Sequence, residues 1–157
     1  MKKIVVLSDT HKNVKAILRL AEIMDESDMV IHLGDHFSDM DDFEALLKGK
    51  LYRVHGNCDF GAQKEIVLEV EGVKIFATHG DLYGVKSGTE RLYKRAKELG
   101  CDLALYGHTH IAKIEERDGI TLINPGCATS LAPTKTFCYL VIAGKKITAV
   151  INDKTIG

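Results

Sequence analysis

The sequence lacks long apolar runs and paired cysteines. No segment approaches the roughly 18 consecutive apolar residues that a membrane-spanning helix needs. The four cysteines form no Cys-x-x-Cys pair, and the chain opens on a strand-like run instead of a signal peptide. We therefore expect a soluble protein of the reducing cytoplasm that does not contact a membrane.

Excess charge and abundant aromatic residues are also missing. The formal net charge is -1, no dense basic stripe is visible, and aromatic residues make up only 6% of the chain. A nucleic-acid partner is therefore not expected, because such partners are usually bound by clustered Lys and Arg. An anionic substrate would have to be attracted by local charge, and we expect a small one.

The length and composition fit one globular domain spanning residues 1–157, with 45% hydrophobic and 27% charged residues. In the first half, β-branched runs at 3–7, 29–33 and 51–55 predict buried strands. Between them, helical spacing predicts one helix over 14–24 and a second around 43–47, with acidic residues at 39–42 in its first turn. Strands alternating with helices indicate an α/β fold.

The second half has a different pattern. A hairpin is expected over 66–77 with its turn at Glu71-Gly72, followed by a helix that begins at a capping box, Ser87 to Glu90, and ends at Gly100. A short strand follows at 103–106. The later runs, at 112–116, 120–123, 137–142 and 147–151, predict a second, largely antiparallel sheet without further helices. We therefore expect two sheets packed face to face with helices outside.

Ligand-type side chains recur where the predicted strands end. They are Asp9, His11, Asp35, Asn57, His79, His108 and His110. A single His or Asp at such a place is often only a hydrogen-bonding or capping residue, but turn preferences do not explain their recurrence in five loops. Asp-x-His and His-x-His leave one residue between ligands, so a locally extended backbone would turn both side chains the same way. Carboxylate, imidazole and amide ligands suit divalent transition ions, and the set exceeds what one ion needs.

These motifs resemble those of the calcineurin-like metallophosphoesterases, especially the small bacterial and archaeal phosphodiesterases of that superfamily. The blocks occur in order as Asp9-x-His11, Gly34-Asp35, Gly56-Asn57, His79-Gly80 and Gly107-His108-Thr109-His110, followed by Asn124-Pro125-Gly126. The match runs nearly end to end. It implies an α/β fold, a four-layer α/β-β/α sandwich of two mixed sheets flanked by helices.

The resemblance also implies two divalent metal ions, with manganese or nickel preferred over iron, cobalt or zinc. It assigns the first ion to Asp9, His11, Asp35 and His110, and the second to Asp35, Asn57, His79 and His108. Asp35 would bridge the two ions, and a hydroxide between them would attack the phosphate of a small ester. Asp35, Asn57 and His108 are the expected catalytic residues, and the resemblance implies self-association into a homo-oligomer.

The residue after Asn57 departs from much of the superfamily, which has a His there near the leaving oxygen. This sequence has Cys58, in a Gly-Asn-Cys-Asp run that several small phosphodiesterases share. We therefore expect phosphodiesters as substrates, with a phosphomonoesterase or a non-catalytic protein-binding scaffold as alternatives. Cys58 would be either a thiolate catalyst or a small residue that shapes the pocket, and the second interpretation is favoured.

Other polar residues flank the blocks without matching a ligand position. Asp59 would either orient a ligand loop or be an ordinary turn residue. His32, His36 and His55 are expected to make hydrogen bonds around the site or to be exposed, not to coordinate a metal. Asp81 stands where some relatives have a further His, and a local polar contact is expected there.

Overall fold

The computed structural model describes residues 1–153 and 156. Its first five-stranded sheet has the order β10-β9-β1-β2-β3. These strands are β1 (Lys2–Leu7), β2 (Met29–His32), β3 (Leu51–Arg53), β9 (Phe137–Ala143) and β10 (Lys146–Asn152). The first three pair in parallel, and β9 and β10 are antiparallel to their neighbours.

The second five-stranded sheet has the order β4-β5-β6-β8-β7. These strands are β4 (Glu65–Val70), β5 (Val73–Thr78), β6 (Leu103–Leu105), β7 (Lys113–Arg117) and β8 (Ile120–Asn124). The central strands β5, β6 and β8 run in parallel, while β4 and β7 form antiparallel edges. Both sheets are therefore mixed, as the fold prediction requires.

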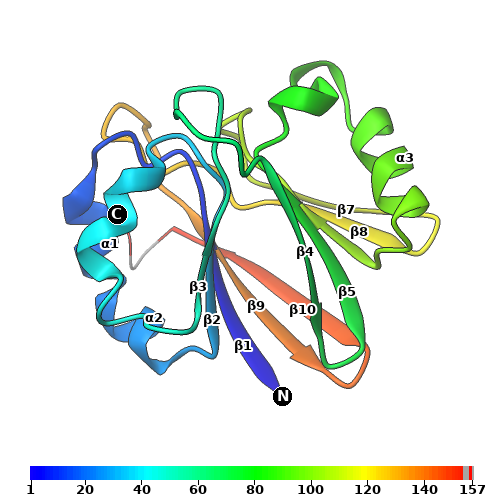
Figure 1. Ribbon diagram of the computed structural model, residues 1–157, viewed down its shortest axis with the longest axis horizontal. Coiled ribbons are helices and arrows are strands. Elements are labelled where there is room, and N and C mark those ends of the chain that lie inside the picture. The colour runs from blue at the N-terminus through cyan, green and yellow to red at the C-terminus, as the bar shows by residue number, and fades with distance from the viewer. Residues whose placement is uncertain (154–155, 157) are drawn as a thin grey trace.

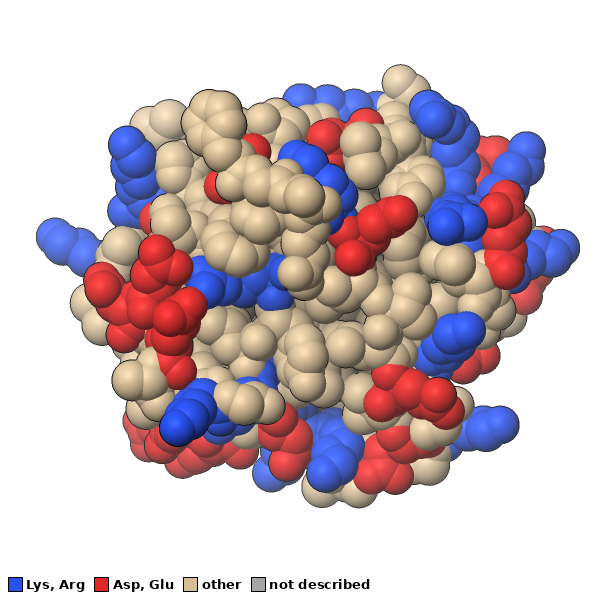
Figure 2. Space-filling view, in the orientation of Figure 1, with Lys and Arg blue, Asp and Glu red and all other residues tan. Residues whose placement is uncertain are grey.

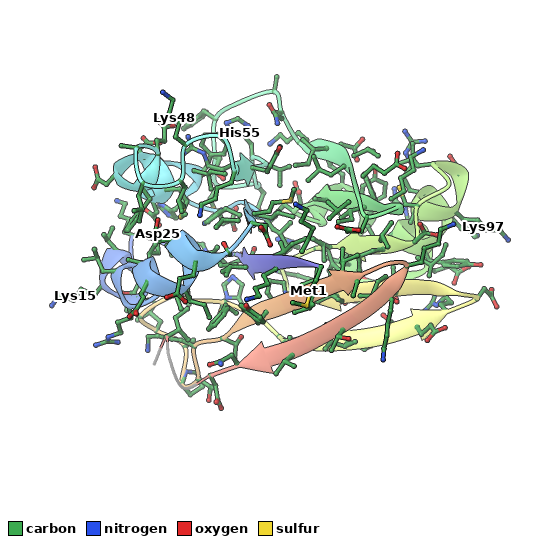
Figure 3. All side chains as sticks on the ribbon, turned by 90° about the horizontal axis from the view of Figure 1, so that it is seen from below. Met1, Lys15, Asp25, Lys48, His55 and Lys97 are labelled. Atoms are coloured by element: carbon green, nitrogen blue, oxygen red, sulfur yellow. The ribbon has the colours of Figure 1, made fainter. Side chains whose placement is uncertain are left out.

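Alternation along the strands produces four layers. On β1, Ile4 and Val6 enter the core between the sheets, whereas Val5 and Leu7 pack beneath the helices on the other face. The second sheet also buries one face between the sheets and packs the other against α3 (Glu90–Glu98). Figure 1 shows α1 and α2 outside one sheet and α3 outside the other. In Figure 3, Lys15 of α1 and Lys97 of α3 point outward at opposite ends of the molecule. The predicted four-layer sandwich is confirmed.

The helical segments differ from the prediction in three places. The expected helix over 14–24 is two helices, α1 (Val14–Arg19) and α2 (Ala21–Glu26), because the buried Leu20 takes φ -94° and ψ -2° between them. The helix expected around 43–47 is instead a 3₁₀ helix, η1 (Phe37–Phe43). Its Asp39 carboxylate is bonded to the loop after β1, which holds the segment there.

The prediction of a capping box at Ser87 to Glu90 before α3 is also wrong. Ser87 belongs to a short 3₁₀ helix, η3 (Val85–Ser87), which follows another, η2 (Asp81–Tyr83). Thr89 is the N-cap of α3, but its hydroxyl donates to Glu115 Oε1 at 2.8 Å instead of accepting from the helix. The predicted end at Gly100 is right, since this residue has φ +68° directly after the C-cap.

The predicted grouping of the last strands is only partly right. The strands β7 and β8 do join the second sheet, but β9 and β10 return to the first sheet beside β1. Apolar alternation identifies which face of a strand is buried and does not specify its partner. In β9, Cys138, Leu140 and Ile142 fill the core between the sheets. A strand in either sheet could bury these side chains there, so the pattern does not tell to which sheet β9 belongs.

Candidate metal centre

The predicted ligands follow the carboxyl ends of strands from both sheets. Asp9, Asp35 and Asn57 come after β1, β2 and β3, which are parallel neighbours in the first sheet. His79 comes after β5, and His108 and His110 come after its parallel neighbour β6 in the second sheet. Because parallel strands end at the same edge, two groups of ligand loops meet where the sheets adjoin.

Six of these side chains form two overlapping clusters. The first contains Asp9, His11, Asp35 and His110, and the second contains Asp35, His79 and His108. In each cluster one possible ligand atom per residue lies within 4.8 Å of the others. Asp35 is common to both, and its Oδ2 is 3.7 Å from His11 Nε2 and 3.4 Å from His79 Nε2.

The hydrogen bonding of the two carboxylates fits a metal centre. Asp9 Oδ2 accepts from the Ser8 hydroxyl at 2.5 Å and from the His108 amide at 3.1 Å, and Asp35 Oδ1 accepts from the Cys58 amide at 3.0 Å. The other oxygen of each carboxylate faces the imidazoles. Among the described residues, buried Asp9 Oδ1 and His11 Nε2 have no hydrogen-bond partner. Buried polar atoms are normally paired, so a cation between them would meet an otherwise unsatisfied need.

The fully buried His79 is oriented in the same way. Its Nδ1–H donates a hydrogen bond to the Leu33 carbonyl at 2.8 Å, which leaves Nε2 directed at the cluster. A metal-binding His commonly has its second nitrogen fixed by such a carbonyl. His79 Nε2 is also 3.2 Å from His108 Nδ1, so two imidazole nitrogens approach without a carboxylate between them.

The structure gives less support for Asn57 as a metal ligand than for the six clustered residues. Its side chain is exposed, and its amide Nδ2 lies 3.7 Å from Cys58 Sγ. The bond from the Cys58 amide to Asp35 nevertheless ties the loop that carries Asn57 to the shared carboxylate. Its role as a ligand stays a prediction.

The electrostatics of the clusters are those of acids and imidazoles packed together. Burial opposes ionisation of Asp9 and Asp35, but the neighbouring histidines more than offset this and lower the pKa of both carboxyls. The pKa of His11 is raised by the adjacent Asp9, and the pKa of His79 is raised, against its burial, by Asp35 and Asp9. The pKa of His108 is lowered by burial and by His79. A bound cation would therefore replace protons held between carboxylates and imidazoles.

The backbone at the ligands corrects one geometric expectation. Asp9 and His11 have φ values of 54° and 40°, and His108 and His110 have φ values of 70° and 65°. Each pair therefore converges through left-handed turns and not through the extended backbone predicted for it. Asp35 is left-handed too, with φ 60°. This conformation disfavours residues with a Cβ, and such strain is often found at functional sites.

Asp59 holds two ligand loops together, which supports its predicted orienting role. Its Oδ1 accepts from the amides of His36 and Phe37, and its Oδ2 accepts from those of Asp35 and Gly56, all at 2.9 to 3.0 Å. One carboxylate thus satisfies backbone donors from the loops after β2 and β3. This fixes the position of Asp35 relative to Asn57.

A second network was not predicted. The Gly34 amide donates to His32 Nδ1 at 3.1 Å, so His32 Nε2 carries the proton and donates to Thr10 Oγ1 at 3.0 Å. The Thr10 hydroxyl donates in turn to Asp39 Oδ2 at 2.6 Å. Thr10 separates Asp9 from His11, so the network fixes the first ligand pair. The expectation that His32 makes hydrogen bonds around the site, without coordinating, agrees with this geometry.

Asn124 supports the second His pair. Its fully buried side chain donates to the Gly107 carbonyl at 3.1 Å and to Thr109 Oγ1 at 2.8 Å, and accepts from the Gly126 amide at 2.9 Å. The sequence signal was the Asn124-Pro125-Gly126 block, which carried the resemblance but not this role.

The remaining flanking residues lie around the centre. The His36 ring centroid is 5.1 Å from that of His11, and the His55 ring stacks on Phe37 at 4.0 Å. Asp81 begins η2 two residues after His79, and its charge acts against the lowering of the His108 pKa by burial and His79. None of the three belongs to either cluster among the described residues.

Comparison with known proteins defines the class. The model of the calcineurin-like phosphoesterase superfamily domain matches residues 1–146. A probable metallophosphoesterase of Bacillus subtilis is 32% identical over 152 residues, covering 95% of this chain and 88% of that protein. A phosphodiesterase of Methanocaldococcus jannaschii is 32% identical over 172 residues, covering 96% and 99%.

The solved structures agree. A novel archaeal phosphodiesterase superimposes with a TM-score of 0.76 at 27% identity, covering 96% of this chain and 99% of that one. Vps29 of Chaetomium thermophilum reaches a TM-score of 0.81 at only 18% identity, covering 96% and 88%, and so shares the fold alone. The fold and the His/Asp clusters are those of a metallophosphoesterase. The chain belongs to the calcineurin-like phosphoesterase superfamily, and its homologues include phosphodiesterases.

Proposed function

We propose that this protein hydrolyses phosphodiester bonds of small substrates at a centre of two divalent metal ions. The observation that supports the proposal best is the pair of overlapping clusters that share Asp35. One ion would be held by Asp9, His11, Asp35 and His110, and the other by Asp35, Asn57, His79 and His108. Oxygen and nitrogen ligands without thiolate suit manganese or nickel, and iron, cobalt or zinc have related preferences.

The chain's own residues account for much of the chemistry. When bound, the two ions would supply positive charge for the phosphate and activate a water as the nucleophile. The water oxygen bonds to phosphorus, the bond from phosphorus to one alcohol oxygen breaks, and a water proton ends on that alcohol. Asp35 would keep both metal sites in one geometry, while Asn57 and His108 stand on opposite sheets and would face the reacting phosphate from two sides.

Cys58 does not provide a nucleophile in this proposal. In the metal-free protein, desolvation and the neighbouring Asp35 raise the pKa of its thiol, which disfavours the thiolate there. The thiol would instead shape the pocket beside Asn57. A monoester substrate places an extra negative charge on its phosphate and usually needs help with an unactivated leaving oxygen, for which the family resemblance implies a His at this position in many members.

A turnover panel tests the proposal. Purified protein stripped of metal is loaded with manganese, nickel, zinc or magnesium and assayed on matched mono- and diesters of 4-nitrophenol, with bound metal measured by elemental analysis. For the wild type we expect two bound ions per chain and faster turnover of the diester. Asp35→Asn should lose both the bound metal and the diester turnover. A strong monoester preference would support the phosphomonoesterase alternative. Absence of both metal binding and turnover would support the scaffold.

A further inference from the structure

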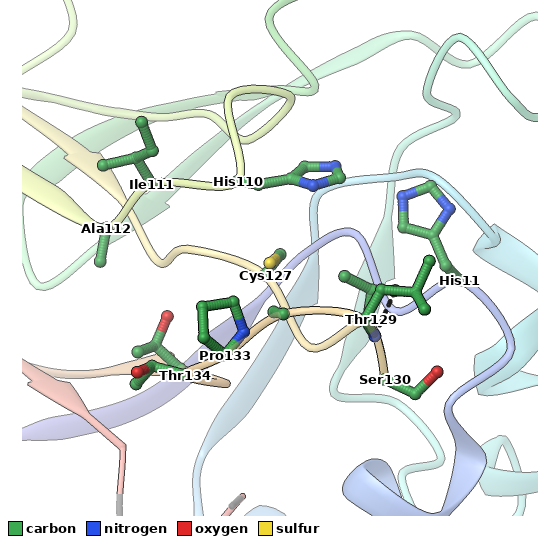
Figure 4. A pocket seen from close by; sticks show the side chains of 12 residues that line it. His11, His110, Ile111, Ala112, Cys127, Thr129, Ser130, Pro133 and Thr134 are labelled. Carbon is green, nitrogen blue, oxygen red and sulfur yellow. Dashed lines mark hydrogen bonds between the residues drawn. The ribbon is translucent and has the colours of Figure 1, made fainter.

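A cavity of about 950 Å³ opens directly beside the candidate metal centre. His11 and His110 line it, and both also belong to the first cluster. Figure 4 shows their imidazoles next to each other on one side of the cavity, while Cys127, Thr129, Ser130, Pro133 and Thr134 line it from the loop after β8. Pockets that hold small molecules have volumes of roughly 300–1,000 Å³. The cavity is therefore large enough for a group attached to the reacting phosphate.

The lining of this cavity is chemically unlike the metal centre. Its apolar part consists of Ile111, Ala112, Cys127, Leu131, Ala132 and Pro133. The rest, apart from the two histidines, is made of Ser and Thr hydroxyls, and no Lys, Arg, Asp or Glu is among the described lining residues. A second phosphate or carboxylate entering here would lose water without gaining a charged partner, which is costly.

Two of the apolar side chains are conspicuously uncovered. Leu131 is 91% exposed and Ile111 is 68% exposed, although both lie at a cavity that ends in polar metal-type ligands. Exposed apolar groups gathered at a pocket next to convergent polar groups are typical of a ligand site. Because the cavity is continuous with the metal centre, its occupant should be part of the molecule whose phosphate is bound there.

We propose that this cavity is the subsite for an uncharged apolar substituent of the substrate. The inference rests on the proposed function and narrows it. The substrate would be a singly charged phosphodiester with at least one aliphatic or aryl alcohol, not a nucleotide or other molecule that carries further anionic groups into the cavity. Leu131 is then a specificity-determining residue, because its side chain would be covered by that substituent.

Binding of two phosphonates tests the subsite without turnover. Calorimetry on the manganese-loaded protein compares phenylphosphonate with methylphosphonate, whose carbon–phosphorus bonds are not hydrolysed. We expect at least a roughly tenfold preference for the phenyl compound, since even small apolar increments in a pocket are worth about tenfold or more. Leu131→Ser should reduce that preference severalfold. The matched control is Leu18→Ser, because Leu18 is a 58% exposed leucine on α1 outside the cavity, and it should leave the preference unchanged.

Turnover separates this inference from the function on which it rests. Phenyl and methyl 4-nitrophenyl phosphate release the same coloured product, and their kcat/KM ratio should follow the binding preference. Equal binding of the two phosphonates, or a preference unaffected by Leu131→Ser, overturns the subsite even if diesters are hydrolysed. A Leu131→Ser variant that changes only the oligomeric mass overturns it too, since a second copy would then cover the patch. A phenyl preference without any diester turnover supports the subsite and refutes the proposed function.

Discussion

The carboxylate of Asp59 organises the centre without belonging to either cluster. It accepts hydrogen bonds from four backbone amides in two ligand loops, a demand that a neutral side chain cannot meet equally well. If these loops separated, the predicted ligand side chains could no longer bind one metal together, although none of them had been changed. The position of Asp35 therefore depends on a residue that would not contact the metal.

Replacing Asp59 should consequently weaken metal binding. For Asp59→Ala we expect a 10- to 100-fold loss of manganese affinity, the usual effect of removing a residue that orients ligands. Titration of the metal-free protein by calorimetry measures this. Asp59→Asn keeps one acceptor oxygen and should fall between wild type and Ala. Asp25→Ala removes an exposed carboxylate, marked in Figure 3, and should have no effect. Normal affinity in Asp59→Ala would contradict the orienting role.

His32 makes a pH-dependent contribution to stability. Its complete burial lowers the pKa of the imidazole from 6.5 to about 4. Between these values the unfolded chain binds more protons than the folded one, so stability rises with pH from about 4 to about 6.5. From this group alone we expect a loss of about 3 kcal/mol between pH 7.5 and pH 4. Urea unfolding at a series of pH values gives the free energy of unfolding of metal-free wild type and His32→Gln. This free energy should depend less on pH in the variant. Equal pH dependence in the two proteins would refute the contribution of His32.

The difference between Asp35 and His32 shows what the sequence could and could not predict. Asp35 was recognisable because carboxylates and imidazoles recur after strands in a fixed order. Thr10, His32, Asp39 and Ser8 carry no such signal, because a hydroxyl or imidazole in a loop has the same appearance whether or not a partner distant in sequence is folded against it. Their roles depend on β1 and β2 lying side by side, which brings the partners together.

At the scale of elements, glycines allow the strand ends to approach. A Cβ added at Gly56 would lie 2.2 Å from Asp35 Oδ1, and one at Gly107 would lie 2.2 Å from Ser8 Oγ and 2.7 Å from Asp9 Oδ2. The first contact is between the loops after β2 and β3. The second joins the loop after β6 to that after β1, and so connects the two sheets.

We expect Gly56→Ala to displace Asp35 and to lower metal affinity at least about tenfold, since shifts near 1 Å in a functional group are costly. The matched control is Gly49→Ala, where an added Cβ meets nothing within 4 Å but the backbone has φ +80°. The control should lose about 1 kcal/mol of stability through backbone strain and keep its metal. Comparing metal content with the urea midpoint of each variant separates the two effects. Equal metal content in both variants would contradict the steric argument.

The elements themselves were predicted unevenly. The β4–β5 hairpin was recognisable because Glu71 and Gly72 form its turn, both with positive φ. The partner of β9 was not recognisable in the sequence, because β9 pairs with β1 across more than 130 residues. Val6, for example, lies opposite Cys138. Local patterns carry no information on such pairings, so the order of strands in each sheet came from the structure.

At the scale of the whole molecule, the centre joins two sheets that have separate outer faces. Asp9, His11 and Asp35 come from the first sheet, and His79, His108 and His110 come from the second. A bound cation would therefore fasten the two halves of the sandwich. Elsewhere, acidic and basic side chains alternate over the face in Figure 2 without a basic stripe, and no described helix is long and apolar enough to cross a membrane.

Metal removal should accordingly lower the stability of the whole fold. At a free metal concentration near 100 times Kd, binding contributes about 2.7 kcal/mol, which corresponds to a Tm increase of about 5–10 °C for a chain of this size. Scanning calorimetry with manganese and with EDTA measures the difference. Asp35→Asn, which removes the shared carboxylate, should show almost none. A metal-independent Tm in wild type would mean that the ion does not connect the sheets.

The left-handed backbone at five of the ligands has a consequence for selection experiments. Glycine adopts this conformation without penalty, and at positions 11 and 110 the imidazoles are partly exposed and give the metal-free fold little packing in return. A library selected only for survival of heating without metal should therefore accumulate glycine at these two positions. The most heat-resistant descendants of this protein would be the ones that had lost two residues of the candidate metal centre.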